Sequence, residues 1–239
     1  MRRWTKTRCS PRSAARRSSP RSGRPGSIAR SVSSRTANVP ADLLPQIGLA
    51  AGAAVASGLR LYGTVAALGF LHRAGILRLP AGLEVLATTP VIVLAAALYV
   101  IEFVADKIPA VDTVWDAIHT FVRAPAAAVL SFAAFGNVQE PWRTVAALLC
   151  GTVAFSSHGL KASSRLAINA SPEPFSNWAA SISEDVFVAV LLWLAVKHPL
   201  AAVVIAGIVL LAAALLAAWI VRMLKRLFSR RPALAASGG

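Results

Sequence analysis

Residues 199–221 read PLAAVVIAGIVLLAAALLAAWIV, a run without a single charged side chain. A transmembrane α-helix needs about 20 predominantly apolar residues, so this run is long enough to cross a bilayer. The basic stretch RMLKRLFSRR follows directly at residues 222–231. Lysine and arginine collect on the cytoplasmic side of a membrane, and we place the end of the run there. The chain is therefore expected to be an integral membrane protein.

Five further stretches have the composition of membrane-crossing helices. They are residues 43–59, 86–106, 124–136, 145–160 and 183–197. Residues 61–79 are apolar enough for half a crossing, but His72, Arg73 and Arg78 interrupt them, so we interpret this segment as re-entrant or interfacial. The predicted fold is an all-α, polytopic membrane helix bundle with about six transmembrane helices in a domain of residues 39–228.

The first 38 residues differ in kind from the rest of the chain. They hold eleven of the 25 Lys and Arg residues and none of the ten Asp and Glu, so most of the net charge of +15 belongs to them. Such a segment has too little apolar surface to offset its ordering entropy. We predict a disordered basic cytoplasmic tail that contacts anionic lipid headgroups, with a second disordered tail at 229–239. A transit peptide, a nucleic-acid-binding arm and a start codon assigned too far upstream are the alternatives.

The chain contains a weak internal repeat. Arg60 and Lys161 each follow a Gly-Leu pair, whereas Lys107 and Lys197 each stand two residues before a proline. With three crossings per half, tandem halves would have opposite orientations, as in many secondary transporters. The sequence therefore predicts two inverted three-helix repeats, of residues 43–138 and 143–225.

Charged residues at the end of the 86–106 segment are the strongest candidates for function. Glu102 and Asp106 are four residues apart, so they share one face of a helix, and Lys107 could neutralise either of them. Charges inside a membrane are costly and mark functional sites. Glu102 and Asp106 could bind a proton or a cation, or the cluster could simply fix the end of the helix.

Residues 111–123 form an amphipathic pattern. Asp112, Asp116 and His119 fall on one face with Arg123, opposite an apolar face that includes Trp115. We interpret this segment as an interfacial helix, with a titratable polar face as the alternative. Two carboxylates and one histidine are too few to predict a metal site.

Glu184 and Asp185 open the 183–197 segment. Carboxylates at a helix N-terminus are favoured by the helix macrodipole, so helix stability alone is one interpretation of this pair. The alternative is that both face the path formed by the first half. The polar path predicted from the sequence runs through Glu102, Asp106, Lys107 and the 112–119 face, with Glu184 and Asp185 opposite.

Several of these residues also carry a resemblance. The Ser-Gly-Leu-Arg ending at Ser57–Arg60, the string Glu102-x-x-x-Asp106-Lys107-x-Pro109-x-x-Asp112 and the Pro125-containing segment resemble a bacterial membrane family catalogued as domain of unknown function 4126. The resemblance covers about residues 43–225. It implies a bacterial membrane protein and no particular activity.

These features favour a small-solute or ion transporter, or a channel-like protein, of the bacterial inner membrane with both termini in the cytoplasm. A non-transporting scaffold or accessory subunit is the main alternative, and a membrane enzyme or lipid-handling protein is a weaker one. The sequence shows no nucleophile elbow, phosphate loop or cofactor-attachment motif, and two cysteines form no metal-ligand pattern. We expect no catalytic residues, cofactor, metal or nucleic-acid partner; the bilayer is the expected partner, and a homo-oligomer is left open.

Overall fold

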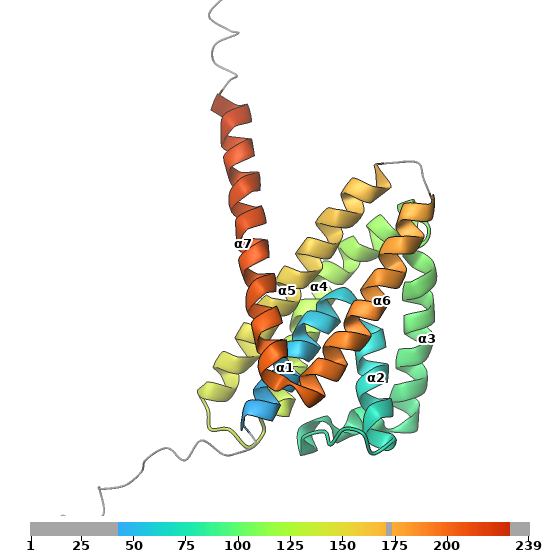
Figure 1. Ribbon diagram of the computed structural model, residues 1–239, viewed down its shortest axis with the longest axis vertical. Helices are drawn as coiled ribbons and strands as arrows, with labels where there is room; N and C mark the ends of the chain where they lie inside the picture. Colours follow the sequence, from blue (N-terminus) through green and yellow to red (C-terminus); the bar gives the residue numbers. More distant parts are fainter. Residues whose placement is uncertain (1–42, 171–173, 230–239) are drawn as a thin grey trace, which may run out of the picture. The chain divides into compact units, whose positions relative to one another are not determined.

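The computed structural model describes residues 43–170 and 174–229, and every regular element in these ranges is a helix (Figure 1). In chain order they are α1 (Leu43–Leu59), α2 (Leu61–Arg73), the 3₁₀ helix η2 (Ala81–Ala87), α3 (Thr89–Ala105), α4 (Pro109–Ala134), α5 (Trp142–Asn169), α6 (Pro174–Lys197) and α7 (Pro199–Ser229). The two predicted disordered tails lie outside the described residues, except that Ser229 ends α7.

Helices α1 and α2 form a helical hairpin. The backbone of Arg60 leaves the helical region, with φ −139° and ψ 81°, and this separates the two helices. Pro45 near the start of α1 and Leu79 beyond the end of α2 line the same surface cavity. Helix α1 therefore begins, and helix α2 ends, at the same end of the bundle. At 1.5 Å per residue, the 17 residues of α1 extend only about 25 Å. The interrupted segment 61–79 is thus the returning arm of the hairpin and its following loop.

Six crossings are not confirmed. Four of the described helices, α4 to α7, are long and apolar enough to cross a membrane, and η2 with α3 makes a fifth if this pair, bent by 66°, counts as one span. The segment 43–59 was expected to cross; it forms the 17-residue helix α1, which is shorter than the helices counted as spans. With this hairpin, five crossings would place the beginning of α1 and the end of α7 at opposite ends of the bundle (Figure 1).

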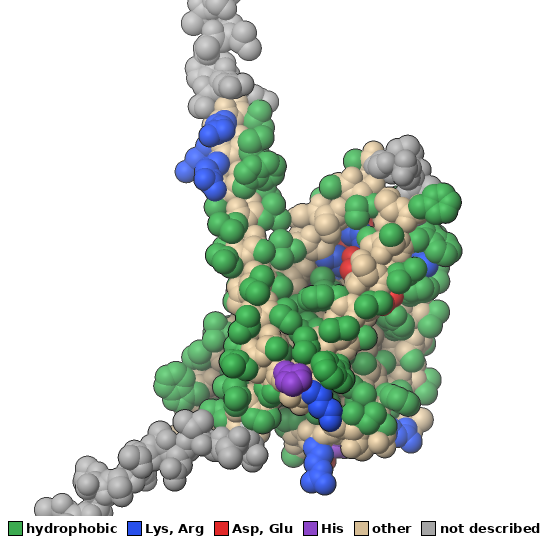
Figure 2. All heavy atoms as spheres, viewed as in Figure 1, with side chains coloured by type: hydrophobic (Ala, Val, Ile, Leu, Met, Phe, Trp, Pro, Cys, Tyr) green, Lys and Arg blue, Asp and Glu red, His purple; other side chains and the backbone are tan. Residues whose placement is uncertain are grey.

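The separate interfacial helix at 111–123 is also a wrong prediction. Residues 111–123 and the short segment 124–136 belong to one helix, α4, which continues through Pro125. The polar face of α4 is turned inward: Asp112 and Arg123 are fully buried, whereas Val114 is 60% and Phe121 82% exposed. A helix in water shows the reverse pattern. This inside-out distribution, together with the hydrophobic surface in Figure 2, identifies a membrane protein.

The inverted repeat is not confirmed either. The α3–α4 connection and the α6–α7 connection do lie at opposite ends of the bundle (Figure 1). Helices α1 and α5, however, run in the same direction: Val55 contacts Ser157, and Leu59, one turn later, contacts Lys161. The repeat required them to be opposed. Because α2 returns to the starting end, the first half has no third crossing to invert.

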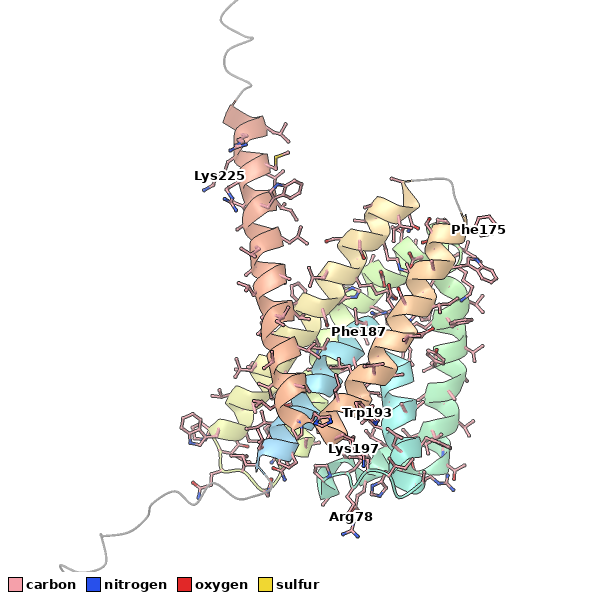
Figure 3. The ribbon with its side chains drawn as sticks, viewed as in Figure 1. Arg78, Phe175, Phe187, Trp193, Lys197 and Lys225 are labelled. Atoms are coloured by element: carbon pink, nitrogen blue, oxygen red, sulfur yellow. The ribbon has the colours of Figure 1, made fainter. Side chains whose placement is uncertain are left out.

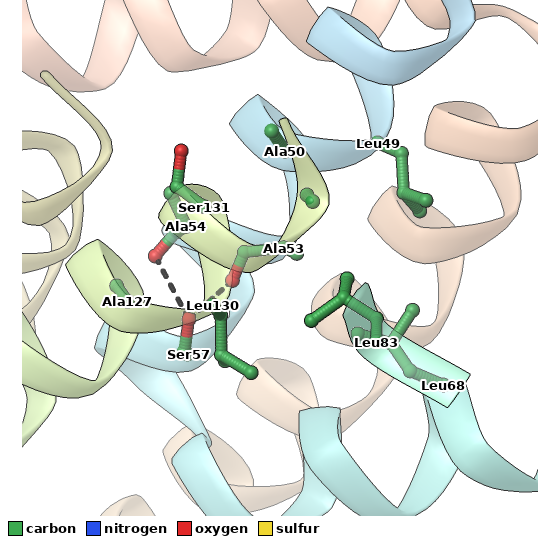
Figure 4. A pocket seen from close by; sticks show the side chains of 11 residues that line it. Leu49, Ala50, Ala53, Ala54, Ser57, Leu68, Leu83, Ala127, Leu130 and Ser131 are labelled. Atoms are coloured by element: carbon green, nitrogen blue, oxygen red, sulfur yellow. Dashed lines mark hydrogen bonds between the residues drawn. The ribbon is translucent and has the colours of Figure 1, made fainter. Parts of the chain in front are cut away.

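Small residues allow α1 to approach its neighbours closely. A Cβ added at Gly58 would lie 2.4 Å from the carbonyl oxygen of Ala154, so α1 and α5 are nearly in backbone contact there. Around the lower part of the hairpin the packing is tight, and a cavity of about 20 Å³ remains beside Ser57 and Ser131 (Figure 4). That volume holds about one water molecule.

Candidate functional site

The interior of the bundle holds a network of charged side chains. Its basic members are Arg60, Arg123, Lys161 and Arg165; its acidic members are Glu102, Asp106, Asp112, Asp116, Glu184 and Asp185. They come from the hairpin tip, the end of α3 and helices α4, α5 and α6. Basic and acidic side chains are visible together between α5 and α6 in Figure 2. The network therefore joins helices that are far apart in the sequence.

Arg60 occupies the tip of the hairpin, where the chain turns from α1 into α2. Its guanidinium pairs with Asp106, and its Nε lies 2.8 Å from the carboxylate of Asp185. The same side chain is 3.4 Å from Glu184 and donates to the Ser181 hydroxyl at 2.7 Å. Arg60 is fully buried, so α3 and α6 both hold the tip through ionic contacts inside the bundle.

Asp106 is the centre of the network. It follows the last residue of α3, and besides Arg60 it contacts Lys161 at 3.2 Å and Arg165 at 3.5 Å. Lys161 and Arg165 are four residues apart on α5 and therefore share one helix face. Arg165 also reaches Glu184 at 3.0 Å. A single carboxylate thus receives three basic side chains, and its negative charge is fully compensated.

Arg123 combines an ion pair with the capping of α1. Its Nη2 lies 2.7 Å from Glu102, and both side chains are fully buried. Its Nη1 donates to the carbonyl oxygens of Gly58 and Leu59 at 2.7 and 2.8 Å. The last carbonyls of a helix have no partner within it, and at this depth water is scarce. Arg123, helped by Lys161 at 3.3 Å from the Leu59 oxygen, supplies the missing donors.

Asp116 lies one helical turn after Asp112 on α4, and its carboxylate has the fewest hydrogen-bond partners in the network. Its carboxylate is 3.6 Å from Arg123 and 3.7 Å from Lys161, and neither of its oxygens accepts a hydrogen bond within the described structure. Two histidines lie nearby. His158 contacts the Asp116 carbonyl oxygen at 3.1 Å, and His119 contacts the Tyr62 hydroxyl at 3.2 Å.

Asp112 differs from the other carboxylates because it forms no ion pair in the described part of the chain. One of its oxygens accepts a hydrogen bond from the neutral Asn169 amide at 3.0 Å, and the other has no donor. Asn169 is held in turn by Asn177 at 2.8 Å. Asp112 is fully buried, so it is a carboxyl group in the bundle interior with only neutral direct partners.

Two predicted residues lie outside the network. Lys107 turns away from Glu102 and Asp106 and lies over the ring of Phe103, 2.9 Å from its centroid. Burial, with repulsion from Arg60, lowers the pKa of its ammonium group. Lys197 is exposed at the far end of α6. The remaining predicted acids and His119 lie in or beside the network, and the repeat markers Arg60 and Lys161 turn out to share Asp106.

The sequence did not single out the basic side of the network. Arg165 lies beyond residue 160, where we ended the fourth span, and α5 continues to Asn169. Arg123 was noticed on the polar face of α4 but not selected. His158 lies within the predicted span 145–160, and the structure buries it beside Asp116. The four-residue spacing of Lys161 and Arg165, which places them on one helix face, was the available signal.

A family model matches residues 47–219, which is most of the described chain; its description is "Domain of unknown function (DUF4126)". The chain belongs to the DUF4126 family. The match covers the whole network of this DUF4126 protein and confirms the resemblance seen in the sequence. No curated protein and no solved structure matches the chain, so the function must be argued from the site itself.

Proposed function

We propose that this DUF4126 protein is a proton-linked transporter, with the buried ionic network as its proton-binding centre. The count of charges supports this. Six carboxylates, of which Glu184 and Asp185 are partly exposed and four are buried, face four buried basic side chains, which leaves two negative charges uncompensated if every group is ionised. An uncompensated charge in a low-dielectric interior costs several kcal/mol, and a carboxylate removes that cost by taking up a proton.

Asp112 is the observation on which the proposal rests. It is fully buried, it forms no ion pair, and its direct partner Asn169 is neutral. The N-terminus of α4 offers it about half a positive charge, which is less than the full counter-charge that each basic partner gives Asp106. Proton uptake by Asp112 is therefore the least costly way to bury it.

A proton path follows the polar face of α4. Asp112, Asp116 and Arg123 lie on this face at intervals of about one and two turns, and Asp116 leads to Arg123 and Lys161. The path begins at the half-buried Asn169 and ends at the hairpin tip. Broken helices whose ends meet inside the membrane are typical of transporter binding sites.

Beyond the tip, the path meets the tightly packed half of the bundle. The hydroxyls of Ser57 and Ser131 lie beside a cavity with room for about one water molecule (Figure 4). A proton needs no wider passage, whereas a larger solute would require the helices to move apart. This favours the proton as the ion that the described conformation can accommodate.

The test is proton flux into liposomes that contain the purified protein and a pH-sensitive dye. Asp112→Asn keeps the shape of the side chain and removes its titration. We expect a loss of about a hundredfold, in the range found when a positioned proton-transfer group is removed. Glu84→Gln, an exposed acid on η2, is the matched control and should retain full flux. Wild-type protein without flux, or Asp112→Asn with unchanged flux, would overturn the proposal.

A further inference from the structure

A groove lies between α6 on one side and α2 and α3 on the other, on the outer surface of the bundle. It consists of two cavities, of about 410 and 240 Å³, which share Ala67, Phe70, Ala189 and Leu192 in their walls. The larger one reaches Arg60, Tyr99 and Asp185, and the smaller one reaches Trp193 and Lys197. The two are therefore one elongated groove, with the network at its inner end and Lys197 at its mouth.

The groove is lined by both very small and bulky residues. Gly63, Ala67 and Ala189 offer almost no side chain, while Phe70 and Trp193 project beside them and are 64% and 55% exposed. Between its two ends every lining residue is apolar or glycine. An elongated apolar groove on the outer surface fits a flexible hydrocarbon chain, which can adapt its conformation to the groove and bury apolar area along it.

The mouth of the groove is basic. Lys197 is exposed there, and Arg78 shares a neighbouring cavity with Val196, which also lines the groove. Figure 3 shows Arg78, Trp193 and Lys197 at the same end of the bundle. Trp193 packs against His198, with 5.6 Å between the ring centroids. An amphipathic aromatic residue beside basic residues is typical of the headgroup level of a membrane.

The length of the groove agrees with one lipid leaflet. Asp185 and Lys197 are twelve residues apart on α6, which corresponds to about 18 Å. Half of a hydrocarbon core about 30 Å thick is about 15 Å. We propose that this groove binds one acyl chain of an anionic phospholipid, whose phosphate is held by Lys197. The methyl end of this acyl chain lies beside Tyr99 and Asp185 and covers the network on its bilayer side. This inference is independent of proton transport.

Native mass spectrometry of the purified protein tests the assignment, with phosphatidylglycerol and phosphatidylcholine of identical chains as probes. Ala189→Trp places an indole in the groove, and we expect it to lower phosphatidylglycerol binding more than about tenfold, since excluding two methylene groups already corresponds to that ratio. Lys197→Gln should weaken phosphatidylglycerol about fivefold, the value of one interfacial lysine, and weaken phosphatidylcholine less, because the choline of that lipid offsets the charge of its phosphate.

Two control variants distinguish this groove from general lipid contact. Val129→Trp fills a different surface cavity, between α2, α3 and α4, and Lys225→Gln removes a basic residue at the end of α7. Both should bind phosphatidylglycerol like the wild type. The proposal is overturned if Ala189→Trp and Val129→Trp have equal effects. It is also overturned if Asp185→Asn abolishes binding while Lys197→Gln does not, because the polar group of the ligand would then lie at the inner end.

Discussion

The pair formed by Glu102 and Arg123 gives the most quantitative test of the buried network. Arg123→Leu removes a guanidinium that lies 2.7 Å from Glu102 and also donates to the carbonyl oxygens of Gly58 and Leu59. Leaving one charge of a buried pair without its partner costs about 3–5 kcal/mol. Each carbonyl that loses its donor adds about 1–3 kcal/mol. We therefore expect the free energy of unfolding to fall by at least about 4 kcal/mol.

Substitution of the acidic partner, Glu102, should lower the free energy of unfolding less. In Glu102→Leu, Arg123 still donates to both carbonyls and stays 3.6 Å from Asp116. The double variant Glu102→Leu, Arg123→Leu removes both charges of the pair, so it should be more stable than Arg123→Leu alone by about 1–3 kcal/mol. It should remain less stable than the wild type, because the Gly58 carbonyl still lacks a donor and the Leu59 carbonyl keeps only Lys161.

Reversible unfolding by SDS in mixed micelles, followed by circular dichroism, measures all three free energies. The comparison between Arg123→Leu and the double variant is the decisive one. Additive losses would mean that the two side chains do not interact, and the network as described would be refuted. A loss below about 1 kcal/mol for Arg123→Leu would refute it as well, since that is the value of an exposed pair.

Two further predictions concern packing and topology. Gly58→Ala should lower the free energy of unfolding by about 1–3 kcal/mol through overpacking, because its new Cβ would lie 1.8 Å from the Ser157 hydroxyl. Gly159→Ala is the control: no atom lies within 4 Å of its new Cβ, so the midpoint temperature of thermal unfolding should stay unchanged or rise slightly. Single cysteines replacing Arg78 and Lys225 in a cysteine-free background should react with a membrane-impermeant thiol reagent from opposite sides; labelling of both from one side would contradict five crossings.

How far the sequence predicts this fold depends on the scale of the pattern. Apolar runs longer than about 20 residues are an unambiguous sign of a bilayer, and α7 begins where the sequence places it. The pattern fails for α4, where Asp112, Asp116, His119 and Arg123 lower the local hydropathy and suggest a surface helix. In this structure the polar face packs against α5 and the hairpin tip. Periodicity identifies a polar face, but only tertiary contacts decide whether that face meets water or protein.

The acidic half of the site was predictable because a carboxylate in an apolar run is conspicuous. Glu102 and Asp106 were therefore found from residue type and spacing alone. Their partners were not, because Arg60, Arg123 and Arg165 come from three other elements and reach Asp106 or Glu102 only after those elements pack. The choice of Lys107 followed from its adjacency to Asp106. Adjacent residues point to different sides of a helix end, and Lys107 lies over Phe103 instead.

The basic residues have a structural reason to be buried, whereas the excess of acids does not. A hairpin tip inside the bundle leaves the last carbonyls of α1 without donors, and Arg123 and Lys161 satisfy them. Compensating the four basic side chains requires four carboxylates, and a scaffold would need no more. The network holds six, and Asp112 forms no ion pair in the described structure. A buried carboxylate without a basic partner weakens a structural support unless it binds a proton, and this argues for proton binding over a purely structural role.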